Sequence, residues 1–204
     1  MDNPDTYRTL ARPSGQILFK EKKSKFFGYA FPIANKEDVK PIIEGLRKKH
    51  QSANHLCFAW QLGVSQINFR ANDDGEPNNS AGMPIYGQIQ SFELTNVLIV
   101  VVRIFGGTKL GIGGLISAYR NAAQLALEAS KIKVKTVTID IEVTFGYANM
   151  DKVMRIIKQN QLKIVSQHLA MDCILTVSTI KSKVQPITLK FNALKGVVAK
   201  SCEV

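Results

Sequence analysis

An unbroken run of apolar, mostly β-branched residues at positions 97–102 leads directly into a segment that holds five glycines. Such a run, with no polar alternation, is typical of a strand that is covered on both faces of a sheet. After the glycines, apolar residues recur at helical spacing, at Leu115, Ala118 and Ala122. The sequence therefore predicts a buried strand over residues 96–103, a glycine-rich turn and a long helix.

This glycine-rich segment is a candidate binding site. Glycines between a strand and a helix expose backbone N–H groups at the positive end of the helix dipole, which suits a phosphate or a carboxylate. The segment is not a Walker A loop, because no Gly-Lys-Ser/Thr tripeptide opens the helix. Glycines in such a turn also serve simply to adopt positive φ angles, and the residues alone leave both interpretations open. The candidate anion-binding residues are Arg103, Gly106, Gly107, Lys109, Gly111, Gly113 and Gly114.

A second candidate site lies in residues 71–84, where a dense set of turn-forming residues predicts a loop. The candidate catalytic groups of this loop are Asp73, Asp74 and Glu76. Their carboxylates could hold a hard cation, act as a general base or pair with Lys109, whereas a solvated turn is the alternative. We assign no metal site to them. The loop and the glycine-rich turn form a single site only if they converge in space, which the sequence does not show.

The order of elements along the chain predicts an α+β protein with two domains, at residues 1–132 and 133–204. The second domain shows strand, helix, strand, strand, helix and strand patterns in succession. This β-α-β-β-α-β order is the ferredoxin-like arrangement.

The chain is strongly basic, with 27 Lys and Arg against 16 Asp and Glu, a net charge of +11. Such an excess favours a polyanionic partner such as RNA, because basic side chains displace counterions from phosphates, although a solvated basic surface is the alternative. The second domain is the more densely basic one and lacks the aromatic pattern of an RRM, so base stacking on its sheet is not expected. Its candidate nucleic-acid-binding residues are Arg155, Lys158, Lys163, Lys181, Lys183 and Lys190.

The cysteines Cys57, Cys173 and Cys202 are far apart and form no Cys-x-x-Cys pair, which argues against a disulfide framework or a zinc site. His55 and Cys57 share one face of a predicted strand, either as a nucleophilic pair or as a buried thiol beside a satisfied histidine. The longest apolar run is far shorter than the ~20 residues of a membrane span, and the first residues lack a signal-peptide pattern. We therefore expect a cytoplasmic protein with no membrane association and no cofactor.

Several motifs together resemble the YigZ/IMPACT family. They comprise Ala53-x-His55-x-Cys57-x-Ala59, the loop motif from Phe69 to Pro77 with Asp73-Asp74-Gly75-Glu76, Ala81-Gly82-x-Pro84-Ile85, and the long motif from Asn96 through Arg103-x-Phe105-Gly106-Gly107-x-Lys109-Leu110-Gly111-x-Gly113-Gly114-Leu115 to Ala118-Tyr119. The resemblance covers essentially the whole chain. It departs at Ile104, where the family usually has Tyr, at Ser117, where Arg is usual, and at Asn79-Ser80, where Gly-Thr is commoner.

This resemblance implies a first domain like the second domain of a ribosomal small-subunit protein and a second domain like one of elongation factor G. Eukaryotic relatives act in translational control through an additional N-terminal domain, so we do not expect that mechanism to transfer as a whole. The first hypothesis is a translation-associated regulatory protein that binds RNA, the ribosome or a translation factor. A metal-assisted enzyme acting on a phosphorylated or acidic small molecule and a purely protein-binding adaptor are the alternatives.

Overall fold

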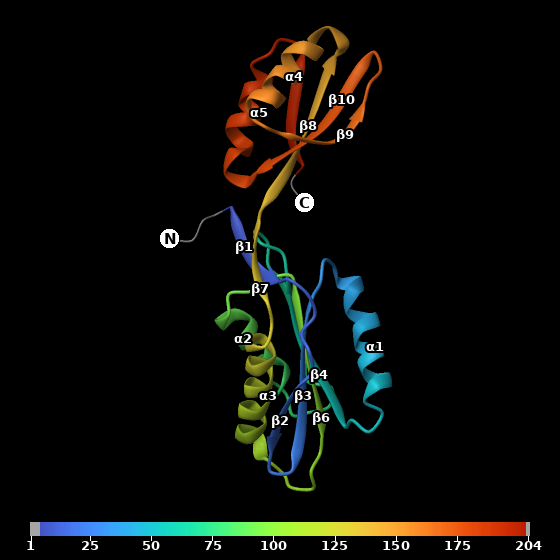
Figure 1. The fold of residues 1–204 in the computed structure, drawn as a ribbon, viewed down its shortest axis with the longest axis vertical. Coiled ribbons are helices and arrows are strands. Elements are labelled where there is room, and N and C mark those ends of the chain that lie inside the picture. The colour runs from blue at the N-terminus through green and yellow to red at the C-terminus, as the bar shows by residue number, and fades with distance from the viewer. Residues whose placement is uncertain (1–4, 203–204) are drawn as a thin grey trace. The chain divides into compact units, whose positions relative to one another are not determined.

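The computed structural model describes residues 5–202, and Figure 1 shows it as a ribbon. The chain divides into two compact units, one of residues 7–135 and the other of residues 136–202 together with residues 5–6. Within the described residues, no helix combines the length and the apolar character that a membrane span requires. The mixture of helices and antiparallel sheets confirms the predicted α+β class.

The first unit is built on a five-stranded antiparallel sheet. Its strand order is β2-β3-β6-β4-β5, which places β6 in the middle. The side chains of β6 from Val97 to Val102 are fully buried, as the continuous apolar run predicts. The strands are β2 (Ile17–Glu21), β3 (Ser24–Pro32), β4 (His55–Leu62), β5 (Asn68–Asn72) and β6 (Val97–Ile104).

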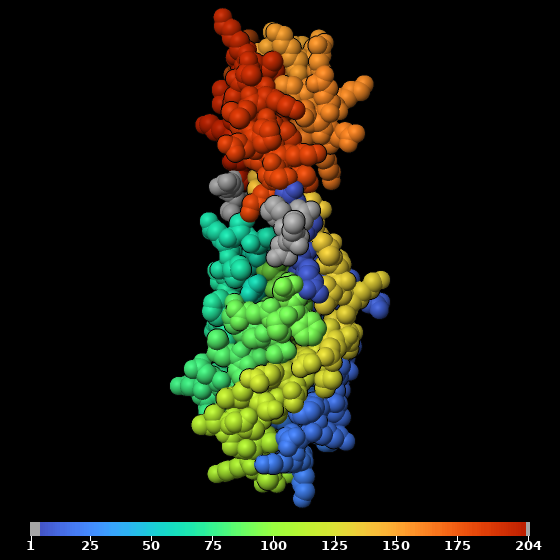
Figure 2. Space-filling view, turned by 90° about the vertical axis from the view of Figure 1, so that its left-hand side faces the viewer, coloured from blue at the N-terminus to red at the C-terminus, as the bar shows by residue number. Residues whose placement is uncertain are grey.

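Helices cover both faces of this sheet. The helices α2 (Gly82–Ser91) and α3 (Gly111–Glu128) pack on one face, where they share a core with alternate residues of β3, β4 and β6. Figure 2 shows the residues of these two helices next to each other on the surface of the unit. The short helix η1 (Lys36–Asp38) leads into α1 (Val39–Lys49), which packs on the other face. Asn35 caps η1 by accepting from the Asp38 N–H.

The sequence patterns do not predict a small two-stranded sheet that the structure contains. It pairs β1 (Thr6–Leu10) with β7 (Ile132–Thr136), segments that contain polar and basic residues between apolar ones. The Ala11 N–H donates to the Lys131 carbonyl oxygen at 2.8 Å and extends the pairing. The lysine-rich segment after α3 therefore forms a strand.

The second unit has the ferredoxin-like topology. Its four antiparallel strands lie in the order β11-β8-β10-β9, and both helices pack on one face over a common core. The predicted β-α-β-β-α-β order is confirmed. The elements are β8 (Thr138–Gly146), η2 (Tyr147–Asn149), α4 (Met150–Gln159), β9 (Lys163–His168), β10 (Asp172–Ile180), η3 (Lys181–Lys183), α5 (Val184–Asn192) and β11 (Val197–Cys202).

Candidate functional site

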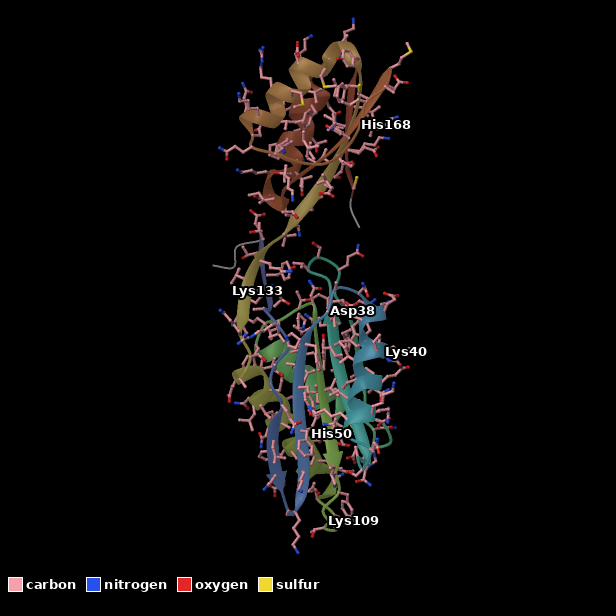
Figure 3. The ribbon with its side chains drawn as sticks, turned by 45° about the vertical axis from the view of Figure 1, so that its right-hand side comes forward. Asp38, Lys40, His50, Lys109, Lys133 and His168 are labelled. Carbon is pink, nitrogen blue, oxygen red and sulfur yellow. The ribbon has the colours of Figure 1, made fainter. Side chains whose placement is uncertain are left out.

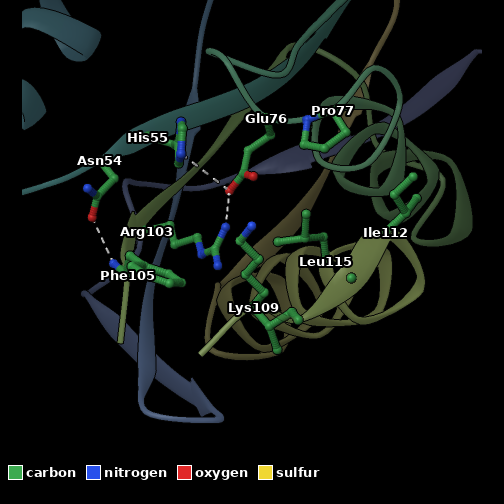
Figure 4. A pocket seen from close by; sticks show the side chains of 11 residues that line it. Asn54, His55, Glu76, Pro77, Arg103, Phe105, Lys109, Ile112 and Leu115 are labelled. Carbon is green, nitrogen blue, oxygen red and sulfur yellow. Dashed lines mark hydrogen bonds and ion pairs between the residues drawn. The ribbon is translucent and has the colours of Figure 1, made fainter. Parts of the chain in front are cut away.

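A cavity of about 440 Å³ opens in the first unit where β6 ends and α3 begins (Figure 4). Residues from four segments meet there: the start of β4, the acidic loop, the end of β6 and the first turn of α3. The acidic loop and the glycine-rich turn therefore do converge. The cavity is lined by Asn54, His55, Glu76, Pro77, Arg103, Phe105, Lys109, Leu110, Gly111, Ile112 and Leu115.

A buried ion pair forms one wall of the cavity. The Arg103 Nη1 donates to the Glu76 Oε1 at 2.6 Å, and both side chains are almost completely shielded from water. The Tyr119 hydroxyl donates to the same oxygen at 2.7 Å. Burial raises the pKa of the Tyr119 phenol, so this group stays a neutral donor to the carboxylate. A buried carboxylate requires such partners, because an unpaired buried charge is very costly.

The guanidinium of Arg103 also lies between two aromatic rings. Its central carbon is 5.6 Å from the centroid of Phe26 and 5.5 Å from that of Phe105. These two cation–π contacts help to hold the planar group in place. The Arg103 Nε is buried and has no hydrogen-bond partner among the described residues. One donor of this fixed cation is therefore left unsatisfied beside the cavity.

The positive end of α3 forms the opposite wall. Leu110 stands at the N-cap position, and no side chain caps the first N–H groups of the helix within the described part of the chain. Gly111 has a φ of +73°, a left-handed conformation that favours glycine over any residue with a Cβ atom. Lys109 lines the cavity, and no carboxylate of the described residues lies within ion-pair distance of it. Figure 4 shows its side chain extending toward the Arg103–Glu76 pair.

His55 faces the same cavity in a fixed orientation. Its Nδ1 lies 2.9 Å from the Asp74 carbonyl oxygen, which can only accept, so Nδ1 carries a proton. The Nε2 lies 3.9 Å from the Glu76 Oε1 and faces the cavity. In the neutral imidazole the Nε2 is thus an acceptor.

Of the three carboxylates singled out in the sequence, only Glu76 reaches the cavity. The Asp73 carboxylate accepts from the N–H groups of Asn79, Ala81 and Gly82, and so holds the loop against the start of α2. The Asp74 carboxylate accepts from the Leu56 N–H at 2.7 Å and pairs with Arg47 at 2.7 Å. Within residues 5–202, no three His, Cys, Asp or Glu side chains are placed to hold a metal ion together.

The glycines singled out in the sequence have different surroundings. Gly111 lines the cavity, whereas Gly106, Gly107, Gly113 and Gly114 are not among its lining residues within the described chain. Gly106 packs against the turn between β2 and β3, where an added Cβ would lie 2.0 Å from the Lys23 carbonyl carbon. Figure 3 shows Lys109 at this same end of the unit.

Cys57 is buried and does not contact His55. Its thiol donates to the Asp73 carbonyl oxygen at 3.0 Å and lies 3.4 Å from the Tyr119 hydroxyl. Burial raises the pKa of the thiol, which opposes formation of the nucleophilic thiolate. The arrangement therefore favours the structural interpretation of this cysteine.

Several lining residues were not singled out by sequence reasoning. Phe105, Ile112 and Leu115 supply the apolar part of the cavity, and Tyr119 supports the ion pair from α3. A signal did exist for Phe105 and Ile112, because both are large apolar residues inside a segment of glycines and turn formers. Residue spacing alone cannot pair Glu76 with Arg103 rather than with Lys109, because this pairing depends on the tertiary structure.

The second unit carries basic residues on and beside its helices, together with Lys163 of β9, which faces the open side of the sheet with its register partner Ser178. We use the name helical basic surface for the six candidate nucleic-acid-binding residues, of which Arg155 and Lys158 are exposed on α4. Three others lie around two neighbouring hollows beside Asn160 and Gln161; these are Lys163, Lys183 and Lys190. The sixth, Lys181, lies in η3.

The opposite face of this sheet has a different character. Glu142 of β8 lies between Thr176 and Lys200 in the strand register, so the exposed face carries mixed charge. Phe145 and Phe191 are both buried in the core on the helical side. Neither phenylalanine is therefore available for base stacking on the exposed sheet face.

One solved structure is similar to this chain over nearly its whole length. A crystal structure of a hypothetical protein is similar with a TM-score of 0.71 and 26% sequence identity, over 98% of each chain. The structure of the two-domain translational regulator Yih1 matches 58% of this chain and 46% of that chain, at 23% identity and a TM-score of 0.37. The second similarity is too low to support a structural argument.

Sequence comparison gives the family. An IMPACT family member of Haemophilus influenzae is 33% identical over 161 residues, which cover 76% of this chain and 77% of that protein. The IMPACT family member YigZ of Escherichia coli is 30% identical over 178 residues, which cover 85% of this chain and 86% of that protein. The family model for the Impact N-terminal domain matches residues 22–127, which include the whole cavity. The chain belongs to the IMPACT family.

Proposed function

We propose that this protein is a translation-associated regulator that binds RNA, either free or within the ribosome, through the cavity at the start of α3 and the helical basic surface. The cavity is the observation that carries the proposal. It combines an uncapped helix N-terminus with two cations, and only one of these cations is neutralised by a carboxylate.

The charges of the cavity suit an incoming phosphate. Glu76 balances the charge of Arg103, so the Lys109 ammonium and the positive end of α3 remain uncompensated. Backbone N–H groups at a helix start and a lysine are the donors that commonly bind phosphate.

The helical basic surface would supply the less specific part of the interaction. Its exposed side chains can follow a phosphate backbone without a fixed geometry, and each contact would release counterions. Glu142 and Asp140 lie on β8, in the sheet, whereas α4 carries one acidic residue, Asp151, a turn before Arg155. The translational role itself is inferred from the family resemblance and from the description of Yih1 as a translational regulator.

The experiment is a fluorescence anisotropy titration of labelled single-stranded and structured RNA with the full chain, at low and at physiological salt. We expect binding that persists at physiological salt and weakens in the triple variant Lys163→Ala, Lys183→Ala, Lys190→Ala. The control variant Lys36→Ala, Lys40→Ala, Lys48→Ala removes the same charge from the surface around α1 and should bind like the unmodified protein. Loss of all binding at physiological salt, or equal weakening in the two triple variants, would contradict the proposal.

A further inference from the structure

We propose that the cavity binds one nucleotide with a terminal phosphate, either a free nucleoside monophosphate or the phosphorylated end of an RNA. The phosphate would lie against Lys109 and the start of α3, and the base against Phe105. This inference rests on the proposed function in using the same cavity, and it specifies the chemistry of the ligand.

The phosphate end is defined by two independent observations. The first is the uncapped start of α3, where the backbone at Leu110, Gly111 and Ile112 lines the cavity. The second is Arg103, whose side chain is 6% exposed, lines the cavity and retains a buried Nε without a partner in the described part of the chain. The Arg103 guanidinium places positive charge beside the helix start, which favours an anionic oxygen there.

The cavity also has an apolar lining that suits a flat aromatic group. Phe105 is 43% exposed and Ile112 is 59% exposed, although both are large apolar residues. Leu115 adds a buried apolar surface to the lining. An exposed aromatic ring that already contacts a guanidinium is a typical platform for base stacking. Exposed apolar residues grouped at one cavity often mark a binding site.

Size and charge favour a single nucleotide with a phosphomonoester. A volume of about 440 Å³ falls within the range of cavities that bind small molecules. A phosphomonoester carries a charge of about −1.5 to −2 near pH 7 and offers three terminal oxygens, which match Lys109, Arg103 and the helix start better than a diester does. In the neutral imidazole, the His55 Nε2 can receive a hydrogen bond from a hydroxyl or an amino group of the nucleotide.

The test is isothermal titration calorimetry of the full chain with adenosine 5′-monophosphate, adenosine and inorganic phosphate. We expect saturable binding of the monophosphate that is at least ~10-fold tighter than that of either part, because stacking and phosphate contacts act together. No saturable binding of the monophosphate, or equal binding of adenosine, would overturn the inference.

Substitutions of two exposed side chains test the phosphate contact and the base contact of the ligand separately. Lys109→Ala should weaken monophosphate binding ~10-fold, and Phe105→Ala should do so to a similar extent, whereas Phe105→Trp should preserve it. The controls are Lys48→Ala on α1 and Phe69→Ala on β5, which lie outside the cavity. Unchanged binding in both Lys109→Ala and Phe105→Ala would overturn the inference.

The source of the nucleotide is distinguished with RNA. Oligonucleotides of one sequence would be compared with a 5′-phosphate, a 3′-phosphate or only hydroxyl ends. Tighter binding of a phosphorylated oligonucleotide that Lys109→Ala abolishes supports an RNA end, and monophosphate binding without this difference supports a free nucleotide. RNA binding without monophosphate binding would overturn this inference and leave the proposed function standing. Monophosphate binding without any RNA binding would support this inference and contradict the proposed function.

Discussion

The cavity of the first unit and the helical basic surface of the second unit present positive charge in different ways. In the cavity, Arg103 is buried between two aromatic rings and bound to Glu76. On the helical basic surface, side chains such as Arg155 and Lys158 are exposed to water. Buried charge is held in one geometry and can recognise the shape of a ligand, whereas exposed charge is screened and adds affinity with little selectivity.

The largest expected difference between the two regions concerns stability. Arg103→Met would leave Glu76 as a buried charge without its cationic partner, and we expect a loss of about 3–5 kcal/mol in the free energy of unfolding. Arg155→Met, on the exposed face of α4, should change this free energy by no more than about 0.5 kcal/mol. Urea denaturation of the full chain would measure both. Similar losses in the two variants would abolish the distinction between the regions.

Substitutions at two glycines in the first turn of α3 should give a smaller difference in stability. Gly111→Ala places a Cβ atom on a residue with a φ of +73°, which should cost about 1–3 kcal/mol. Gly113→Ala, in the same turn of α3, meets no neighbouring atom and should stabilise the protein by about 0.5–1 kcal/mol, because alanine favours the helix. Thermal or urea unfolding would show the opposite signs. Destabilisation by both substitutions would mean that the left-handed residue is not what sets this turn.

The buried network should also produce a pH dependence. Burial raises the pKa of the Cys57 thiol, so the unfolded chain releases this proton near pH 8.5 while the folded chain retains it. Above that pH the folded state binds more protons, and stability therefore falls by about 1.4 kcal/mol per pH unit for this group. Comparing urea unfolding of the unmodified protein and of Cys57→Ala between pH 7 and pH 10 isolates its contribution.

The two variants should converge in stability as the pH rises, and identical pH dependence would contradict the assignment. Thiol reactivity gives a further check across the two units. Cys202 is exposed, and it should react with a thiol reagent at pH 8 while Cys57 stays protected.

Sequence patterns predicted the parts of the molecule that depend on local periodicity. Apolar spacing reflects which face of an element is covered. It therefore predicted the buried run of β6, the helix after the glycines and the β-α-β-β-α-β order. The strands β1 and β7 were not predicted, because each is short and their pairing joins segments that are distant in sequence.

The candidate site was predictable as a set of segments and not as a geometry. Asp73, Asp74 and Glu76 are close neighbours in one loop, yet two of them hold the loop in place and one enters the cavity. This division depends on which backbone N–H groups lie within reach after folding, which no residue spacing reveals. The exposed Phe105 and Ile112 acquire meaning only once β6 and α3 are placed side by side.

The most direct test of RNA binding by these two regions is a map of the residues that contact RNA. Amide signals of the isotopically labelled full chain would be followed by NMR during titration with a short RNA at physiological salt. We expect saturable shifts at residues 109–113 and across the helices α4 and α5, with little change on α1. Shifts confined to α1, or no saturable shifts at all, would contradict the proposed function.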